Sequence, residues 1–282
     1  MTRRAVSVVA GLVLMAWTLL PIYWLANLSL MNGMQVLSRQ LVVDPPTIEN
    51  YVRITGNPYV DSSGTLLPAS GYAPQVMAGL FNSLVVALAV LCLTMILATP
   101  LAYALGKLSF RGRRSLLLTI ISSRLYPPIA TAIPLLALYH SFGILGTHVG
   151  LVLAHLTITL PLATWVLTSF FRQLPRELES LARTDGCGRW ETIGRVMVPI
   201  ARPALVAVGV IAFFTSWNDF TMGTILAAGY PAQTLAPSLA SMFFHVSEPN
   251  WMAAGAVLGL VPPAVLALVF QRHIQSLNLV GA

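Results

Sequence analysis

Charged side chains are scarce in this chain of 282 residues: they make up 9%, whereas soluble domains carry about a quarter. Apolar residues reach 56% and the aromatic share is ordinary, so the excess is aliphatic. Water cannot be the main solvent for such a surface. The composition therefore excludes an ordinary soluble domain and favours an α-helical membrane protein.

Cysteine occurs only twice, and its placement indicates no special site. Cys92 falls in an apolar run and Cys187 in a polar segment, so neither a disulfide framework nor a metal knuckle is indicated. The five histidines lack metal-ligand spacing, and no His/Asp/Glu/Cys cluster suggests a membrane-embedded enzyme. We therefore expect no metal site and no catalytic residue in this chain.

Six stretches are apolar and long enough for membrane helices, which need roughly 20 such residues. The first follows Arg3 and Arg4, but its apolar core is too long for a signal peptide, so we expect it to be retained. No internal repeat divides the chain, and residues 1–282 are expected to form one transmembrane domain. The predicted helices cover about residues 6–30, 77–105, 115–142, 147–170, 203–228 and 251–270.

Basic residues are distributed unevenly between the two ends of these helices. Thirteen lie before the first helix, in the connections 106–114 and 172–202, or after the sixth helix, and only Arg39 and Arg53 lie at the other ends. The positive-inside rule therefore places both termini and both arginine-rich connections in the cytoplasm. The net charge of +7 is thus a topology signal in a chain surrounded by membrane lipid, and no nucleic-acid partner is expected.

The external loop 31–76 is long enough to form structure of its own. Pro45-Pro46 predicts a short helix directly afterwards. A piece rich in glycine, proline and serine follows, from Ser62 to Pro74, and it favours irregular chain.

The cytoplasmic loop 172–202 is predicted to form two short amphipathic helices around a glycine turn. Pro175 suits the first turn of a helix, and Asp185-Gly186 marks the turn that ends it. The second helical piece is expected from about Arg189 to Met197 and to end at Pro199. Composition alone leaves open whether these helices lie on lipid headgroups or dock onto a partner.

This loop resembles the EAA motif of ABC importer permeases, which reads Glu-Ala-Ala, two residues, Asp-Gly, nine residues, and Ile-x-Leu-Pro. Ala182 and Asp185-Gly186 match, and Val196–Pro199 fills the last four places after nine intervening residues. The chain departs from the motif at its first two places, which hold Ser180 and Leu181 instead of Glu and Ala. Glu179 is adjacent, but a helix turns by about 100° per residue, so it faces another way.

Other segments resemble the carbohydrate-uptake branch of these permeases, which includes the maltose and glycerol-phosphate systems. The resemblance covers nearly the whole chain and implies a type I ABC importer permease fold with six transmembrane helices and a cytoplasmic coupling helix. The similar segments are Leu20–Trp24, Phe81–Leu84, Ala102–Ala104, Phe110–Arg113, Ser216–Phe220, Phe270–Arg272 and the closing Gly281-Ala282.

The resemblance also implies partners. The coupling helix would sit in a cleft of a separate ATPase subunit, present as a dimer, which binds ATP and Mg²⁺. A second permease subunit forming a heterodimer and an extracytoplasmic solute-binding protein would complete the importer, in a bacterial inner membrane. This chain has no GxxxxGK[ST] loop, so we expect it to carry no cofactor and not to hydrolyse ATP. The implied coupling contacts are Glu179, Ser180, Leu181, Ala182, Asp185 and Gly186.

Polar residues inside the apolar stretches are candidates for the solute path, because unpaired charge is costly there. Arg124 lies about nine residues into the third stretch, or roughly 14 Å deep. It is expected either to line the cavity and donate to the solute, or to form a structural ion pair, with Asp219 as one candidate partner. Asn218 and Asp219 match a family motif in the fifth stretch, for which a structural or gating role is favoured. His155 is expected to make a hydrogen-bonded contact between helices.

Three functions remain to be compared. The first is an ABC permease that imports a sugar, an oligosaccharide or a sugar-like solute. The second is an ABC permease for a non-sugar solute such as glycerol phosphate. The third is an ion-coupled secondary transporter, which usually places carboxylates at the midplane; Asp219 is the only acidic residue in the six stretches and argues against it.

Overall fold

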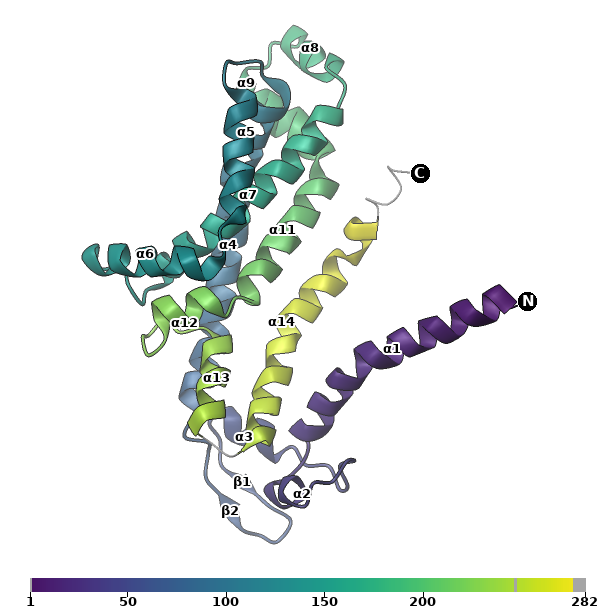
Figure 1. The fold of residues 1–282 in the computed structure, drawn as a ribbon, viewed down its shortest axis with the longest axis vertical. Helices are drawn as coiled ribbons and strands as arrows, with labels where there is room; N and C mark the ends of the chain where they lie inside the picture. The colour runs from purple at the N-terminus through teal and green to yellow at the C-terminus, as the bar shows by residue number, and fades with distance from the viewer. Residues whose placement is uncertain (1, 246–247, 276–282) are drawn as a thin grey trace. The chain divides into compact units, whose positions relative to one another are not determined.

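The computed structural model describes residues 2–245 and 248–275, and this part of the chain is mostly helical (Figure 1). The helices are α1 (Thr2–Ser29), α2 (Gly33–Leu37), α3 (Glu49–Ile54), α4 (Ala73–Lys107), α5 (Arg113–Ser122), α6 (Pro128–Ser141), α7 (His148–Gln173), α8 (Glu177–Thr184), α9 (Arg189–Glu191), α10 (Val198–Ile200), α11 (Arg202–Trp217), α12 (Thr221–Ala227), α13 (Leu235–His245) and α14 (Pro249–Gln275). A 3-10 turn, η1 (Ser123–Leu125), follows α5, and a π-helix, η2 (Thr192–Met197), joins α9 to α10.

The predicted all-α membrane architecture is confirmed, but two of the predicted spans are not single straight helices. In the described residues, α1, α4, α7 and α14 are each long and apolar enough to cross a membrane. Two bent pairs bring the number to six if each pair counts as one span. They are 113–125 with 128–141, bent by 95°, and 189–200 with 202–217, bent by 83°.

The third predicted stretch is broken at Pro127-Pro128, which explains the first bend. Tyr126 before the prolines is extended, with φ −75° and ψ 130°, as expected for a residue that precedes proline. Pro128 then begins α6, where its missing N–H has no cost. The fifth predicted stretch is also divided, because α11 ends at Trp217 and α12 begins at Thr221.

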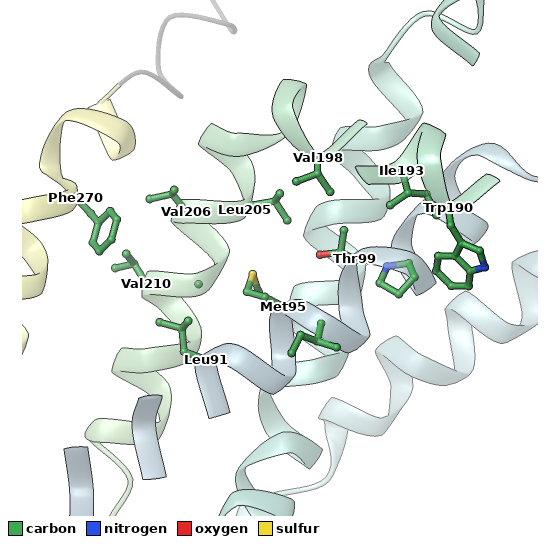
Figure 2. A pocket seen from close by; sticks show the side chains of 13 residues that line it. Leu91, Met95, Thr99, Trp190, Ile193, Val198, Leu205, Val206, Val210 and Phe270 are labelled. Atoms are coloured by element: carbon green, nitrogen blue, oxygen red, sulfur yellow. The ribbon is translucent and has the colours of Figure 1, made fainter. Parts of the chain in front are cut away.

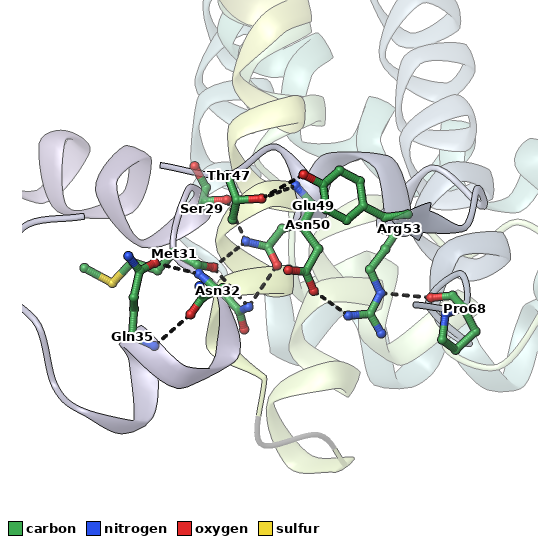
Figure 3. A network of polar contacts seen from close by, with 11 residues as sticks. Ser29, Met31, Asn32, Gln35, Thr47, Glu49, Asn50, Arg53 and Pro68 are labelled. Carbon is green, nitrogen blue, oxygen red and sulfur yellow. Dashed lines mark hydrogen bonds and ion pairs between the residues drawn. The ribbon is translucent and has the colours of Figure 1, made fainter. Parts of the chain in front are cut away.

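The chain divides into two compact units, and α4, α13 and α14 contribute to both. The first unit consists of the described residues of 1–80 and 238–261. At its centre Asn50 donates Nδ2 to the carbonyls of Ser29 and Met31, at 2.9 and 2.7 Å, and Asn250 donates to Asn50 Oδ1 at 2.8 Å (Figure 3). Arg53 pairs with Glu49 at 2.7 Å, which fixes α3.

The helix predicted after Pro46 is α3, but the chain beyond it is not wholly irregular. β1 (Tyr59–Val60) pairs antiparallel with β2 (Leu66–Leu67), with Tyr59 opposite Leu67. Asp61 organises the turn, since its Oδ1 accepts the backbone N–H groups of Ser63 and Thr65, both at 2.9 Å. These bonds, and first of all that from the Ser63 hydroxyl, lower the pKa of the Asp61 carboxyl.

The second unit consists of the described residues of 81–237 and 262–282, and its core holds α4, α7 and α11 together. Small side chains allow close packing here: a Cβ on Gly106 of α4 would lie 2.9 Å from the Cβ of Phe171 on α7. Phe171 is fully buried, and its ring meets that of Tyr103 edge to face at 6.2 Å. Thr94 and Thr159 join α4 to α7 by a hydrogen bond of 2.8 Å.

Candidate functional site

Helix α8, the predicted coupling helix, has two different faces. Ala182 is buried, with 3% of its surface exposed, whereas Leu181 is 62% exposed although it is apolar. Ser180 is exposed as well, while Glu179 is partly buried. The predicted contact residues therefore divide between an outward face that could meet a partner and an inward face that packs on the chain itself.

The inward face connects α8 to the end of α4. Glu179 lies close enough to Tyr103 and Lys107 of α4 to interact with both electrostatically. Lys107 donates Nζ to the carbonyl of Leu174, the residue that directly follows α7. A displacement of α8 would therefore act directly on the ends of two long helices.

The turn after α8 is a Schellman motif, in which two backbone bonds close the last helical turn. The N–H of Gly186 donates to the carbonyl of Arg183 at 3.0 Å, and that of Cys187 donates to Ala182 at 2.9 Å. Gly186 has φ +80°, a conformation that glycine adopts without steric cost. The predicted Asp185-Gly186 turn is thus present, and both residues are exposed.

The second helical piece of the loop differs from the prediction at its end. Pro199 does not end it: α9, η2 and α10 continue as one helical segment to Ile200. Pro199 lies near the end of this segment, as the second residue of α10 directly after the π-helix. The bend of 83° follows at Ala201, directly before α11.

Asp219 lies at the break between α11 and α12 and contacts two other elements. Its Oδ2 accepts the backbone N–H of Gly223 in α12 at 3.0 Å, and it lies 3.3 Å from His155 Nε2 of α7. The other ring nitrogen, His155 Nδ1, shares a hydrogen bond of 2.7 Å with Ser216 Oγ of α11. His155 is 2% exposed, so this cluster joins three helices in the interior of the unit. The hydrogen-bonded contact between helices that was predicted for His155 is therefore present.

Arg124 and Asn218, the other two candidates for the solute path, are both exposed. The ion pair of Arg124 with Asp219 is not formed, because Asp219 is engaged by His155 and Gly223. Among the residues that the structure describes, no carboxylate pairs with Arg124. Arg124 lies in η1, at the sharp bend before α6, whereas Asn218 lies at the break between α11 and α12.

A large recess of about 540 Å³ in the second unit is a poor candidate for a sugar site. Met95 of α4, Leu205 of α11 and Phe270 of α14 line it, as Figure 2 shows. Thr99 and Trp190 supply the only O–H and N–H side-chain groups among the lining residues. Sites for polar solutes need several convergent polar groups, so this recess suits apolar chains instead.

The junction of α4 with the α12–α13 connection was not predicted from the sequence. Asn82 Nδ2 donates to the carbonyls of Pro231 and Gln233, at 2.8 and 2.9 Å, and its Oδ1 lies 2.8 Å from His148 Nε2. The sequence did contain a signal for this junction: an asparagine in an apolar helix needs hydrogen-bond partners, because an unpaired amide is costly there. His148 lies 66 residues away in the sequence, and Pro231 and Gln233 lie 149 and 151 residues away, so the pattern could not identify these partners.

Comparison with known proteins gives a consistent result. The family model described as "Binding-protein-dependent transport system inner membrane component" matches residues 98–277. The trehalose transport system permease protein SugB of Mycobacterium tuberculosis is 30% identical over 278 residues, which are 97% of this chain and 96% of that protein. The trehalose/maltose transport system permease protein MalG of Thermococcus litoralis is 27% identical over 282 residues, or 99% and 96%.

A solved structure shares the fold. It is a chain of a bacterial ABC transporter involved in the import of the acidic polysaccharide alginate, with a TM-score of 0.76 and 18% sequence identity. The match covers 97% of this chain and 98% of that chain.

Proposed function

This chain belongs to the family of binding-protein-dependent transport system inner membrane components, and from this premise we propose that it is the permease subunit through which an ATP-driven importer moves a carbohydrate into the cytoplasm. The observation that carries the proposal is the match over nearly the whole chain to permeases named for trehalose and maltose. Membership of this family argues against the third candidate function, an ion-coupled secondary transporter. A non-sugar solute such as glycerol phosphate remains the second candidate substrate.

The proposed importer contains partners that supply what this chain lacks. An ATPase dimer binds ATP and Mg²⁺, a solute-binding protein delivers the substrate, and a second permease subunit forms a heterodimer with this chain. The arginine distribution supports an orientation with both termini and the α8 loop in the cytoplasm. The ATPase then meets the loop on that side of the membrane.

We propose that the outward face of α8 is the contact with the ATPase. This face carries Ser180, Leu181 and the exposed turn Asp185-Gly186. An exposed leucine beside a rigid glycine turn is suited to insertion in a cleft, as amphipathic helices use apolar anchors in grooves. Glu179 and Ala182 would act from the inner face, by holding α8 against α4 and the rest of the second unit.

The proposed function is tested by uptake into proteoliposomes that contain the assembled importer. Radiolabelled trehalose and maltose should accumulate only when ATP is present on the cytoplasmic side and the binding protein on the other. Glycerol 3-phosphate serves as the comparison substrate. Uptake of a sugar without ATP would refute the ATP-driven mechanism, and uptake of glycerol 3-phosphate alone would change the substrate class.

Arg124 is proposed to face the solute path, because an exposed and unpaired charge within an apolar stretch needs water or solute around it. Replacing Arg124 by Met should lower uptake by about tenfold, the loss expected for one hydrogen bond to a charged group. Arg124→Lys should retain more activity because it keeps the charge. Uptake kinetics are measured at equal amounts of assembled complex, and unchanged kinetics in Arg124→Met would remove this residue from the path.

A further inference from the structure

A second pocket of the second unit differs from the apolar recess, because it is lined by arginines. It has a volume of about 600 Å³, and its lining residues come from the start of α5, the segment before it and the end of α7. Figure 1 shows where these helices lie in the chain. We call it the basic pocket and define it by Phe110, Gly112, Arg113, Arg114, Leu118 and Arg172. None of these residues belongs to the proposed coupling surface or to the candidate solute path.

The positive charge of the basic pocket is not balanced by the chain. Among residues 2–245 and 248–275, no carboxylate forms an ion pair with Arg113, Arg114 or Arg172. Arg172 and Arg176 both lie near enough to Arg113 to act on it electrostatically, and both are cations. Three like charges around one cavity repel each other, so an anion bound between them would offset this electrostatic repulsion.

The groups around the pocket are arranged for a phosphate. Arg113 is held in place, since its Nη1 and Nη2 donate to the carbonyls of Leu108 and Gly106, at 3.1 and 3.2 Å. Arg114 and Arg172 are exposed, so their guanidinium groups remain available. Guanidinium groups bind phosphate oxygens with two parallel hydrogen bonds, which makes arginine the preferred residue for this ligand.

The start of α5 adds to this arrangement. The N–H of Arg113 donates to the carbonyl of Phe110 at 3.4 Å. The next N–H groups at the start of the helix have no partner within it, and Gly112, with φ +83°, provides no side chain to cap them. An anion beside this terminus is favoured by the helix dipole. Ten residues of helix follow, from Arg113 to Ser122.

The rim of the pocket is apolar, and this favours a phosphate compound that also carries an apolar part. Phe110 is 43% exposed and Leu118 is 55% exposed, and both line the pocket. A ligand that satisfies arginines and exposed apolar side chains at one place has a charged head and an apolar tail. Basic pockets at the cytoplasmic ends of membrane helices are suited to such headgroups.

We propose that the basic pocket binds the headgroup phosphate of an anionic phospholipid from the cytoplasmic leaflet. The inference rests on the proposed orientation of the chain, which puts the connection between α4 and α5 on that side. It does not depend on the transported solute. Each exposed arginine near an anionic lipid contributes about fivefold in affinity, so Arg114 and Arg172 together contribute about 30-fold.

Native mass spectrometry of the assembled importer tests this site without any transport measurement. The purified complex is titrated with phosphatidylglycerol and, separately, with phosphatidylcholine. The double variant Arg114→Gln, Arg172→Gln should bind phosphatidylglycerol about 30-fold more weakly than the parent complex. Arg172→Gln alone, with an intermediate loss, provides a second variant in case the double variant assembles poorly.

The matched control removes two charges from the same side of the membrane but outside the pocket. Arg111→Gln with Arg202→Gln changes two exposed arginines that do not line it, and its lipid binding should match that of the parent. An equal loss in this control, or equal binding of phosphatidylcholine, would overturn the proposal, because the effect would then be one of general surface charge.

Two further measurements distinguish other anions and other partners. Inorganic phosphate is added at millimolar concentration; displacement of phosphatidylglycerol at that concentration would show that the pocket takes a free anion rather than a lipid. The ATPase content of the complex is read from the same spectra. Loss of the ATPase from the double variant, with lipid binding intact, would assign the arginines to a protein contact and refute the lipid site.

Discussion

Replacing Gly186 by valine should abolish ATP-dependent uptake, to below about a tenth of the parent rate, while the chain still inserts in the membrane. Gly186 has φ +80°, and a β-branched residue is strained in this conformation by about 1–2 kcal/mol or more. Space is not the cause, because a Cβ on Gly186 would have no atom within 4 Å. The strain instead opens the turn that the Arg183 and Ala182 carbonyls close, and it displaces Asp185 within the proposed contact surface.

Gly186→Asn is the matched control, because asparagine tolerates the left-handed conformation far better than valine does. It should therefore retain much of the uptake although it adds a polar side chain. Uptake and ATPase activity of the reconstituted complex are measured at equal amounts of inserted chain. If Gly186→Val transported normally, the turn would not be a coupling element. If both variants failed equally, the contact would depend on the absence of a side chain rather than on backbone conformation.

Hydropathy predicted most of the long helices, because this signal is local and large. The ranges expected for the first, second, fourth and sixth spans overlap α1, α4, α7 and α14 with ends that differ by a few residues. Hydropathy does not indicate where an apolar segment bends. The third stretch therefore looked like one helix, although Pro127-Pro128 turns it by 95°.

In the cytoplasmic loop 172–202, the motif and helical geometry together predicted which side chains of α8 face outward. Helical geometry indicated that Glu179 faces a different way from Ser180, and the structure places Ser180 outside and Glu179 towards α4. The π-helix within the second helical piece was not predicted from the sequence. The break at Asn218 was also missed. The contact that Asp219 makes there is with the backbone N–H of Gly223, which leaves no signal in the side-chain pattern.

The cluster around Asp219 is the other place where one substitution should have a large effect. Asp219→Ala removes the acceptor of the Gly223 N–H and the group that faces His155 Nε2. Leaving such buried groups without a partner costs about 1–3 kcal/mol, and the break between α11 and α12 would lose its geometry. We therefore expect the variant complex to have a lower melting temperature and a several-fold lower uptake rate.

Asp219→Asn and Asn218→Ala separate structure from solute contact. Asp219→Asn keeps an oxygen that can accept from Gly223, so it should recover much of the stability lost in Asp219→Ala. Asn218→Ala changes an exposed neighbour at the same break and should leave the melting temperature unchanged. Thermal unfolding and uptake are measured on the same preparations. A normal melting temperature for Asp219→Ala would contradict the structural role. A defect in uptake alone would then assign Asp219 to gating or to contact with the solute.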